Sequence, residues 1–68
     1  MPELLSIVLP VLNEEAILQD TYERLKKVVS GLGWGYELIF VDDGSTDNSL
    51  SILEDLARKD TQVKIISF

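Results

Sequence analysis

Two short polar clusters bring together the side chains that could do chemistry in this sequence. The first, PVLNEE, runs from Pro10 to Glu15, and the second, VDDGSTD, runs from Val41 to Asp47. Ionised carboxylates only accept hydrogen bonds, so they suit a ligand that carries N–H donors, or a hard cation such as Mg²⁺ or Mn²⁺. They are unsuited to holding a phosphate. Each cluster follows an apolar segment, which must position it.

The apolar segments have the composition of buried strands, and the segments between them have the spacing of helices. Leu4–Leu9, Glu37–Val41 and Val63–Phe68 are rich in branched residues, and Pro10 is expected to end the first strand. Apolar residues recur three or four positions apart in two stretches, which predicts two amphipathic helices: Leu18, Tyr22, Leu25, Val29 and Leu32 in one, and Leu50, Leu53, Leu56 and Ala57 in the other.

Polar residues ahead of both stretches resemble helix starts. Asn13 is a candidate cap for the first helix, with Glu14 and Glu15 in its first turn. Ser45 or Thr46 is a candidate cap for the second, with Asp47 in its first turn.

The order strand, helix, strand, helix, strand predicts an α/β fold. We expect a three-layer, Rossmann-like parallel sheet with the strand order 3-2-1, and residues 1–68 as a single partial domain. The carboxyl ends of parallel strands meet at one rim, so Asn13, Glu14, Asp42 and Asp43 are expected to lie near one another.

Composition excludes several classes of partner and site. The net charge is −6 and the six basic residues are scattered, so a nucleic acid is not expected to bind. Histidine and cysteine are absent, which removes the usual general base and any thiolate metal site. The longest apolar run, Ile7–Leu12, contains Pro10 and is too short to span a membrane. This segment is therefore expected to be soluble and cytoplasmic, without membrane contact.

Three familiar ligand-binding patterns do not fit. A dinucleotide fold needs a glycine-rich turn after the first strand, where this chain has Pro10, Asn13, Glu14 and Glu15. The DDGSTD stretch lacks the alternating carboxylates of an EF-hand calcium loop. A phosphoacceptor receiver domain is less favoured, since its acidic pair should follow the first strand rather than the second.

The segment SIVLPVLNEE followed by YELIFVDDGSTDNSLSIL resembles the amino terminus of family 2 nucleotide-sugar glycosyltransferases, which have the GT-A fold. The dolichyl- or polyprenyl-phosphate sugar transferases are the most similar branch, and the resemblance covers essentially the whole chain. It implies transfer of a sugar from a UDP- or GDP-sugar to an acceptor such as a polyprenyl phosphate. It also implies a longer parent enzyme, associated with the cytoplasmic face of a membrane.

The same resemblance implies a nucleotide-binding role for residues of both clusters. The residues that border the nucleobase pocket in the family correspond to Pro10, Val11, Leu12 and Glu14, and the acid that contacts the base corresponds to Asp42. Asp43 completes that turn, where bonding to its own backbone is the preferred interpretation. Leu12 departs from the family pattern, which often has tyrosine there.

The resemblance also implies what this segment lacks. Family members hold Mg²⁺ or Mn²⁺ with a later DxD motif and use a later carboxylate as base, so we assign no catalytic residue and no metal ligand here. The isolated segment is then expected to be inactive. The alternative is a truncated or engineered structural module without activity, a homo-oligomer that self-associates through the open edge of the first strand, as a symmetric dimer.

Overall fold

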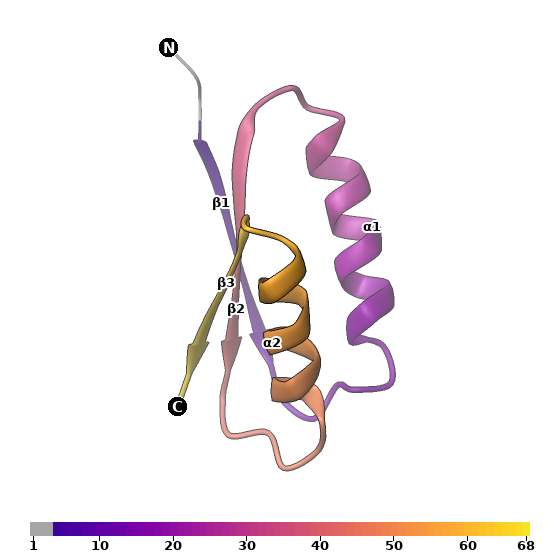
Figure 1. Ribbon diagram of the computed structural model, residues 1–68, viewed down its shortest axis with the longest axis vertical. Coiled ribbons are helices and arrows are strands. Elements are labelled where there is room, and N and C mark those ends of the chain that lie inside the picture. Colours follow the sequence, from indigo (N-terminus) through magenta and orange to yellow (C-terminus); the bar gives the residue numbers. More distant parts are fainter. Residues whose placement is uncertain (1–3) are drawn as a thin grey trace.

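The computed structural model describes residues 4–68, which alternate between strands and helices (Figure 1). The elements are β1 (Leu4–Val11), α1 (Leu18–Ser30), β2 (Gly35–Asp42), α2 (Ser49–Lys59) and β3 (Val63–Ser67). The strands form one parallel sheet in the order β1-β2-β3, so β2 lies in the centre. The prediction of an α/β fold with a parallel sheet is confirmed.

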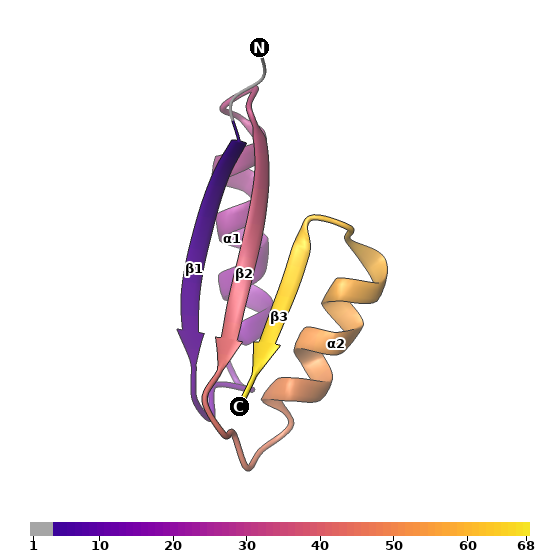
Figure 2. The same ribbon diagram turned by 90° about the vertical axis from the view of Figure 1, so that its left-hand side faces the viewer.

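The two helices lie on the same face of the sheet, as Figures 1 and 2 show together. The described residues therefore form two layers, and the expected three-layer arrangement is wrong for them. The strand order gives the reason. The two β–α–β connections lead from β1 to β2 and from β2 to β3, so both move across the sheet in the same direction. Because such connections are right-handed, two that move in the same direction place their helices on the same face of the sheet. A third layer requires a crossover in the opposite direction.

The hydrophobic core lies between the sheet and the helices. Leu38 and Phe40 of β2 and Leu53 of α2 are completely buried. The neighbouring strands and α1 complete this core with Val11, Leu18, Val29, Leu56 and Val63. Alternate residues of each strand point the other way, and no helix of the described chain covers them. Val8 is consequently 60% exposed despite its apolar side chain.

Strand β1 continues through Pro10 to Val11, two residues beyond the expected end. β1 is an edge strand here, because β2 is its one partner among the described residues. The Val11 carbonyl accepts a hydrogen bond from the Asp43 N–H, which follows β2. Backbone groups alternate in direction along a strand, so the nitrogen of Pro10 points to the open edge, where no donor is needed.

Both helices begin later than the sequence predicts. The residue that caps α1 is Ile17 and the one that caps α2 is Asn48, and neither cap makes a side-chain hydrogen bond. The predicted cap Asn13 precedes an intervening turn, in which the N–H groups of Ile17 and Leu18 donate to the Glu14 carbonyl. No helix of the described residues is long and apolar enough to cross a membrane.

Candidate functional site

The two polar clusters form two loops that lie side by side at the carboxyl ends of β1 and β2, at the bottom of Figure 1. The β1–α1 loop comprises residues 12–17 and the β2–α2 loop comprises residues 43–48. The last residues of the two strands, Val11 and Asp42, are partners in the sheet register. The expectation that parallel strands would bring these clusters together is confirmed.

Hydrogen bonds join the two loops in both directions. The β1–α1 loop donates three backbone N–H groups to side chains of the other loop and of α2: Asn13 to Ser45 Oγ (3.0 Å), Glu14 to Ser49 Oγ (2.9 Å) and Glu15 to Asp47 Oδ2 (3.2 Å). In return, the Asn13 side-chain oxygen accepts the N–H groups of Thr46 (2.7 Å) and Asp47 (3.3 Å). The rim is thus one bonded unit, although its halves are about thirty residues apart in sequence.

Asp47 accepts hydrogen bonds with both of its carboxylate oxygens. Its Oδ1 accepts the Ser49 N–H at 2.9 Å, two residues further on, while its Oδ2 accepts the Glu15 N–H. Hydrogen bonding from Ser49, and then from the Glu15 N–H, lowers the pKa of Asp47 below its ordinary value. Both carboxylate oxygens of Asp47 are therefore engaged within the rim.

Asp42 is the unusual group of this rim. Its side chain points toward the helical layer, is 2% exposed, and leaves Oδ1 buried without any hydrogen-bond partner. A buried polar atom without a partner costs free energy, and folded proteins seldom retain one without a reason. Asp42 thus holds an unused acceptor directly beneath the two loops.

The structure separates the other predicted site residues. Val11 is buried beside Asp42, whereas Pro10 lies on the uncovered face of the sheet. Leu12 is 53% exposed on the rim, and Glu14 is half-buried. Asp43 is exposed and its carboxylate makes no hydrogen bond within the described chain, so the expected bond to its own backbone is not formed. That kind of bond occurs at Asp47 instead.

The described residues do not fit a divalent cation site. They contain no group of three or more acidic side chains close enough to hold a metal ion. Asp42 and Asp43 also diverge, because the former is buried under the loops and the latter faces solvent.

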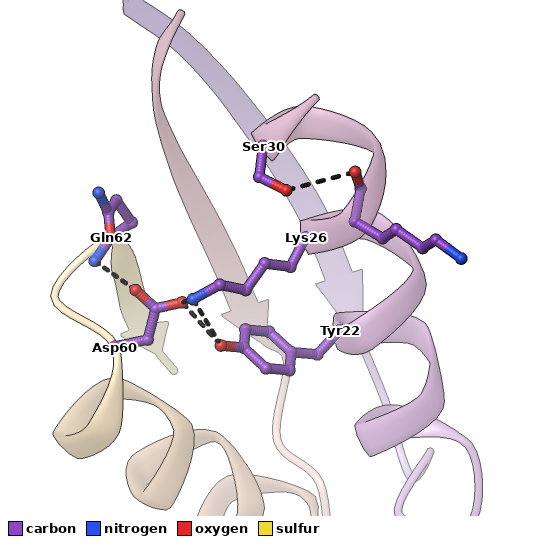
Figure 3. A network of polar contacts seen from close by, with 6 residues as sticks. Tyr22, Lys26, Ser30, Asp60 and Gln62 are labelled. Carbon is purple, nitrogen blue, oxygen red and sulfur yellow. Dashed lines mark hydrogen bonds and ion pairs between the residues drawn. The ribbon is translucent and has the colours of Figure 1, made fainter. Parts of the chain in front are cut away.

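A separate group of polar side chains, the Asp60 cluster, lies at the amino end of β3, away from the rim (Figure 3). Its centre is Asp60, whose Oδ2 accepts hydrogen bonds from Lys26 Nζ (2.6 Å) and the Tyr22 hydroxyl (2.7 Å). Its Oδ1 accepts the Gln62 N–H at 3.0 Å. The cluster ties α1 to the turn between α2 and β3.

Sequence reasoning missed this cluster, because Asp60 stands in a short polar stretch that is typical of an exposed turn. The available signals were the spacing of Tyr22 and Lys26, which places both on one face of a helix, and the position of Asp60 two residues before Gln62. Those signals do not reveal that the aspartate is 5% exposed.

Comparison with known proteins bears directly on the two loops of the rim. The sequence model described as "Glycosyl transferase family 2" matches residues 6–68, which include both loops. The chain belongs to glycosyl transferase family 2. The resemblance inferred from the two motifs is confirmed.

Relatives of this family 2 chain include glycosyltransferases with and without a named acceptor. It is 51% identical over 63 residues to the uncharacterized glycosyltransferase YkcC of Bacillus subtilis, covering 93% of this chain and 20% of that protein. It is 47% identical over 55 residues to an undecaprenyl-phosphate 4-deoxy-4-formamido-L-arabinose transferase of Pseudomonas fluorescens, covering 81% of this chain and 16% of that protein.

A transferase of the same name from Proteus mirabilis is 52% identical over 52 residues, covering 76% of this chain and 16% of that protein. The family 2 chain thus spans a fifth or less of the length of these relatives.

Proposed function

We propose that this chain forms the nucleotide-binding part of a glycosyltransferase that transfers a sugar from a UDP- or GDP-sugar to a polyprenyl phosphate. Membership of family 2 supports glycosyl transfer in general, and the names of the Pseudomonas and Proteus relatives support the acceptor class. A cytoplasmic location, predicted from sequence, fits this proposal and remains a prediction.

The observation that carries the proposal is the free buried oxygen of Asp42. Uracil and guanine both carry ring N–H donors, and an ionised carboxylate is an acceptor. The Asp42 Oδ1 has no donor of its own within the described chain, so a base N–H would satisfy it. The same bond would distinguish uracil from cytosine, whose corresponding ring nitrogen is an acceptor.

The neighbouring rim residues have matching roles in this proposal. Leu12 is exposed next to the end of β1 and offers an aliphatic surface to one face of the base. Glu14 forms part of the pocket wall, while its N–H is held by Ser49. Because Asp42 is 2% exposed, side chains of the rim must move aside when the base enters, while the hydrogen bonds between the two loops are kept. Binding is therefore coupled to a small side-chain movement at the rim.

We further propose that the 68-residue chain binds nucleotide without transferring sugar. Transfer from a nucleoside diphosphate sugar leaves negative charge on the departing diphosphate, which a divalent cation can stabilise. The described residues contain no cluster able to hold that cation. The Mg²⁺ or Mn²⁺ expected for the family is therefore proposed to bind residues of a longer enzyme.

A proton–nitrogen NMR titration of the 68-residue chain with UDP, GDP and CDP tests the nucleotide site. We expect saturable shifts at Leu12, Glu14 and residues 42–44 with UDP or GDP, and much weaker shifts with CDP. Asp42→Ala should abolish them. Asp55→Asn, which removes a carboxylate from an exposed ion pair on α2, is the matched control. A dispersed spectrum with no shifts would refute the proposal.

A second candidate function is self-association as a structural module. The uncovered sheet face exposes Leu4, Val8 and Ile66, and the outer edge of β1 has no partner within the described chain. Beside that edge, Leu9, Leu25 and Val28 line an apolar groove. Light scattering after size exclusion should then report a homo-oligomer, and Val8→Lys should dissociate it. A monomer at high concentration would exclude this function.

A further inference from the structure

The hydrogen bonds of the rim converge on Asn13. Its backbone N–H donates to Ser45 Oγ at 3.0 Å, so its main chain is fixed to the β2–α2 loop. Its side-chain Oδ1 accepts the N–H of Thr46 at 2.7 Å, the Thr46 hydroxyl at 3.3 Å and the N–H of Asp47 at 3.3 Å. No other side chain of the described residues accepts two successive backbone N–H groups from the facing loop.

The backbone of Asn13 is shaped for this contact. Its φ angle is +50°, in the left-handed region that asparagine, aspartate and glycine occupy more readily than other residues. The Asn13 side chain bonds to the β2–α2 loop and α1 begins only at Leu18, so Asn13 does not cap that helix. Both the conformation and the acceptor are therefore needed at this position.

The segment that Asn13 holds begins directly after the proposed base-binding strand, β2. Residues 43–48 follow Asp42 directly, and Gly44 at φ +79° makes the turn between Asp43 and Ser45. With Asn13 in place, Thr46 and Asp47 are fixed at four and five residues after Asp42, which carries the free carboxylate oxygen. Without it, their N–H groups return to solvent and the turn loses an anchor.

We infer that Asn13 is a positioning residue for the nucleotide site: its side-chain oxygen holds the β2–α2 loop in the arrangement that presents Asp42 to the base. This inference rests on the proposed nucleotide-binding function. Asn13 itself makes no contact with the base in this scheme. It acts by raising the fraction of molecules whose rim is ready to bind.

The expected effect on affinity follows from that fraction. If the loop without its anchor adopts the binding arrangement in about one molecule in ten, the apparent affinity falls about tenfold. The contact that is lost joins two exposed loops, so the core of Leu38, Phe40 and Leu53 is not disturbed. A positioning role thus predicts a loss of binding in a folded protein.

Three variants of the 68-residue chain separate the acceptor from the backbone conformation. Asn13→Gly retains access to the left-handed conformation and removes the acceptor, whereas Asn13→Asp retains both. Asn48→Ala is the matched control, since its side chain contacts Glu15 Oε2 at 3.2 Å but anchors no backbone N–H. Circular dichroism melting establishes that each variant is folded.

Two measurements are made on each variant. Amide hydrogen exchange and the heteronuclear NOE of residues 43–47, without ligand, report loop order, and titration with UDP and GDP reports affinity. We expect Asn13→Gly to lose loop order and about tenfold in affinity. Asn13→Asp should restore both to within about threefold of the wild type, and Asn48→Ala should match the wild type.

The loop measurement tests the anchoring role of Asn13, and the titration of the wild type tests the proposed function, so the two proposals can be refuted independently. If the wild type binds neither nucleotide, the proposed function is wrong, and loop order in Asn13→Gly still decides whether Asn13 anchors the loop. If Asn13→Gly keeps its loop order and affinity, the positioning role is refuted. An Asn13→Asp variant as disordered as Asn13→Gly also refutes it, because the acceptor would then not be the anchor. If Asn13→Gly fails to fold, the loop order and affinity of Asn13→Asp against those of the wild type decide instead, and a loss of loop order in Asn13→Asp refutes the role.

Discussion

Replacement of Asp60 should destabilise the fold more than replacement of any exposed aspartate. The Asp60 carboxylate is 4% exposed and accepts three hydrogen bonds, from Lys26, Tyr22 and the backbone N–H of Gln62 (Figure 3). Asp60→Ala removes all three at once. Asp60→Asn removes the charge and leaves one oxygen acceptor, which can serve either the Tyr22 hydroxyl or the Gln62 N–H but not both.

The magnitude follows from the exposure of the two charges. Breaking a fully buried ion pair costs about 3–5 kcal/mol and breaking an exposed one costs less than about 1 kcal/mol. The Lys26 side chain is 40% exposed and can recover water, so the pair lies between these limits. We expect the free energy of unfolding to fall by about 2 kcal/mol for Asp60→Ala and by about 1 kcal/mol for Asp60→Asn. For a chain of this size, about 2 kcal/mol lowers Tm by roughly 8–16 °C.

The stabilisation by this cluster should disappear in acid. Burial acts to raise the pKa of Asp60, but the hydrogen bonds from Lys26, Tyr22 and the Gln62 N–H outweigh burial and lower it. A carboxyl with a lowered folded pKa stabilises the fold above its unfolded pKa of about 3.9, and this contribution is lost as pH falls through the folded value.

The lysine of the pair sets the other end of the pH range. The hydrogen bond to Asp60 raises the pKa of Lys26 against the opposing effect of desolvation. A lysine with a raised folded pKa stabilises the fold below its unfolded pKa of about 10.4, and this contribution is lost as pH rises through the folded value. The pair is therefore at full strength between about pH 5 and pH 9.

Urea denaturation followed by circular dichroism, at pH 7 and pH 3, measures these effects. Asp20→Ala is the matched control, because its partner Arg24 lies at 2.9 Å but the two side chains are 66% and 81% exposed. The control should change the free energy of unfolding by less than about 0.5 kcal/mol. A cost below that value for Asp60→Ala at pH 7, or an undiminished cost for Asp60→Asn at pH 3, would refute the reasoning.

Five further substitutions, of which Ile17→Ala and Gly33→Ala are controls, test the core and the rim. Leu53→Ala, in a completely buried position, should lose about 3 kcal/mol in urea denaturation, whereas Ile17→Ala, at 56% exposure, should lose less than about 1 kcal/mol. Gly44→Ala and Gly33→Ala, at φ +79° and +74° in open space, should each lower the free energy of unfolding by about 1 kcal/mol. In a UDP titration, only Gly44→Ala of the two should weaken binding. Asp42→Asn should raise the free energy of unfolding by about 1 kcal/mol, because it removes an unpartnered buried carboxylate. The same variant should weaken UDP binding. A loss of stability would contradict this account of Asp42.

Local patterns predicted the elements but not their layers. The apolar stripe of α2 was read correctly, because Leu53 and Leu56 face the core at helical spacing. The strands are apolar on both faces, which led to the expectation of three layers. The apolar residues show that the face of the sheet at Val8 is apolar, but they do not identify which element, if any, lies against it. The end of β1 was missed for a similar reason, since Pro10 is tolerated only where the strand's outer edge is free.

The prediction that the two polar clusters meet at one rim is confirmed, but the helix-start roles predicted for Asn13 and Asp47 are wrong, and the error is informative. Asn13 and Asp47 were both read as residues of the helix next to them, because helix starts are recognised from neighbours in sequence. Each is instead bonded to the other loop, and neither helix has a side-chain cap.

These exchanged contacts give a physical reason for the two motifs to occur together. The first motif supplies Asn13 as the acceptor for the second, and the second supplies Asp47 and Ser49 as acceptors for the first. Neither loop can satisfy its own backbone when the other is replaced. Finding both motifs at the carboxyl ends of adjacent parallel strands is thus far more informative than finding either one, which is a pattern that an isolated loop could carry for other reasons.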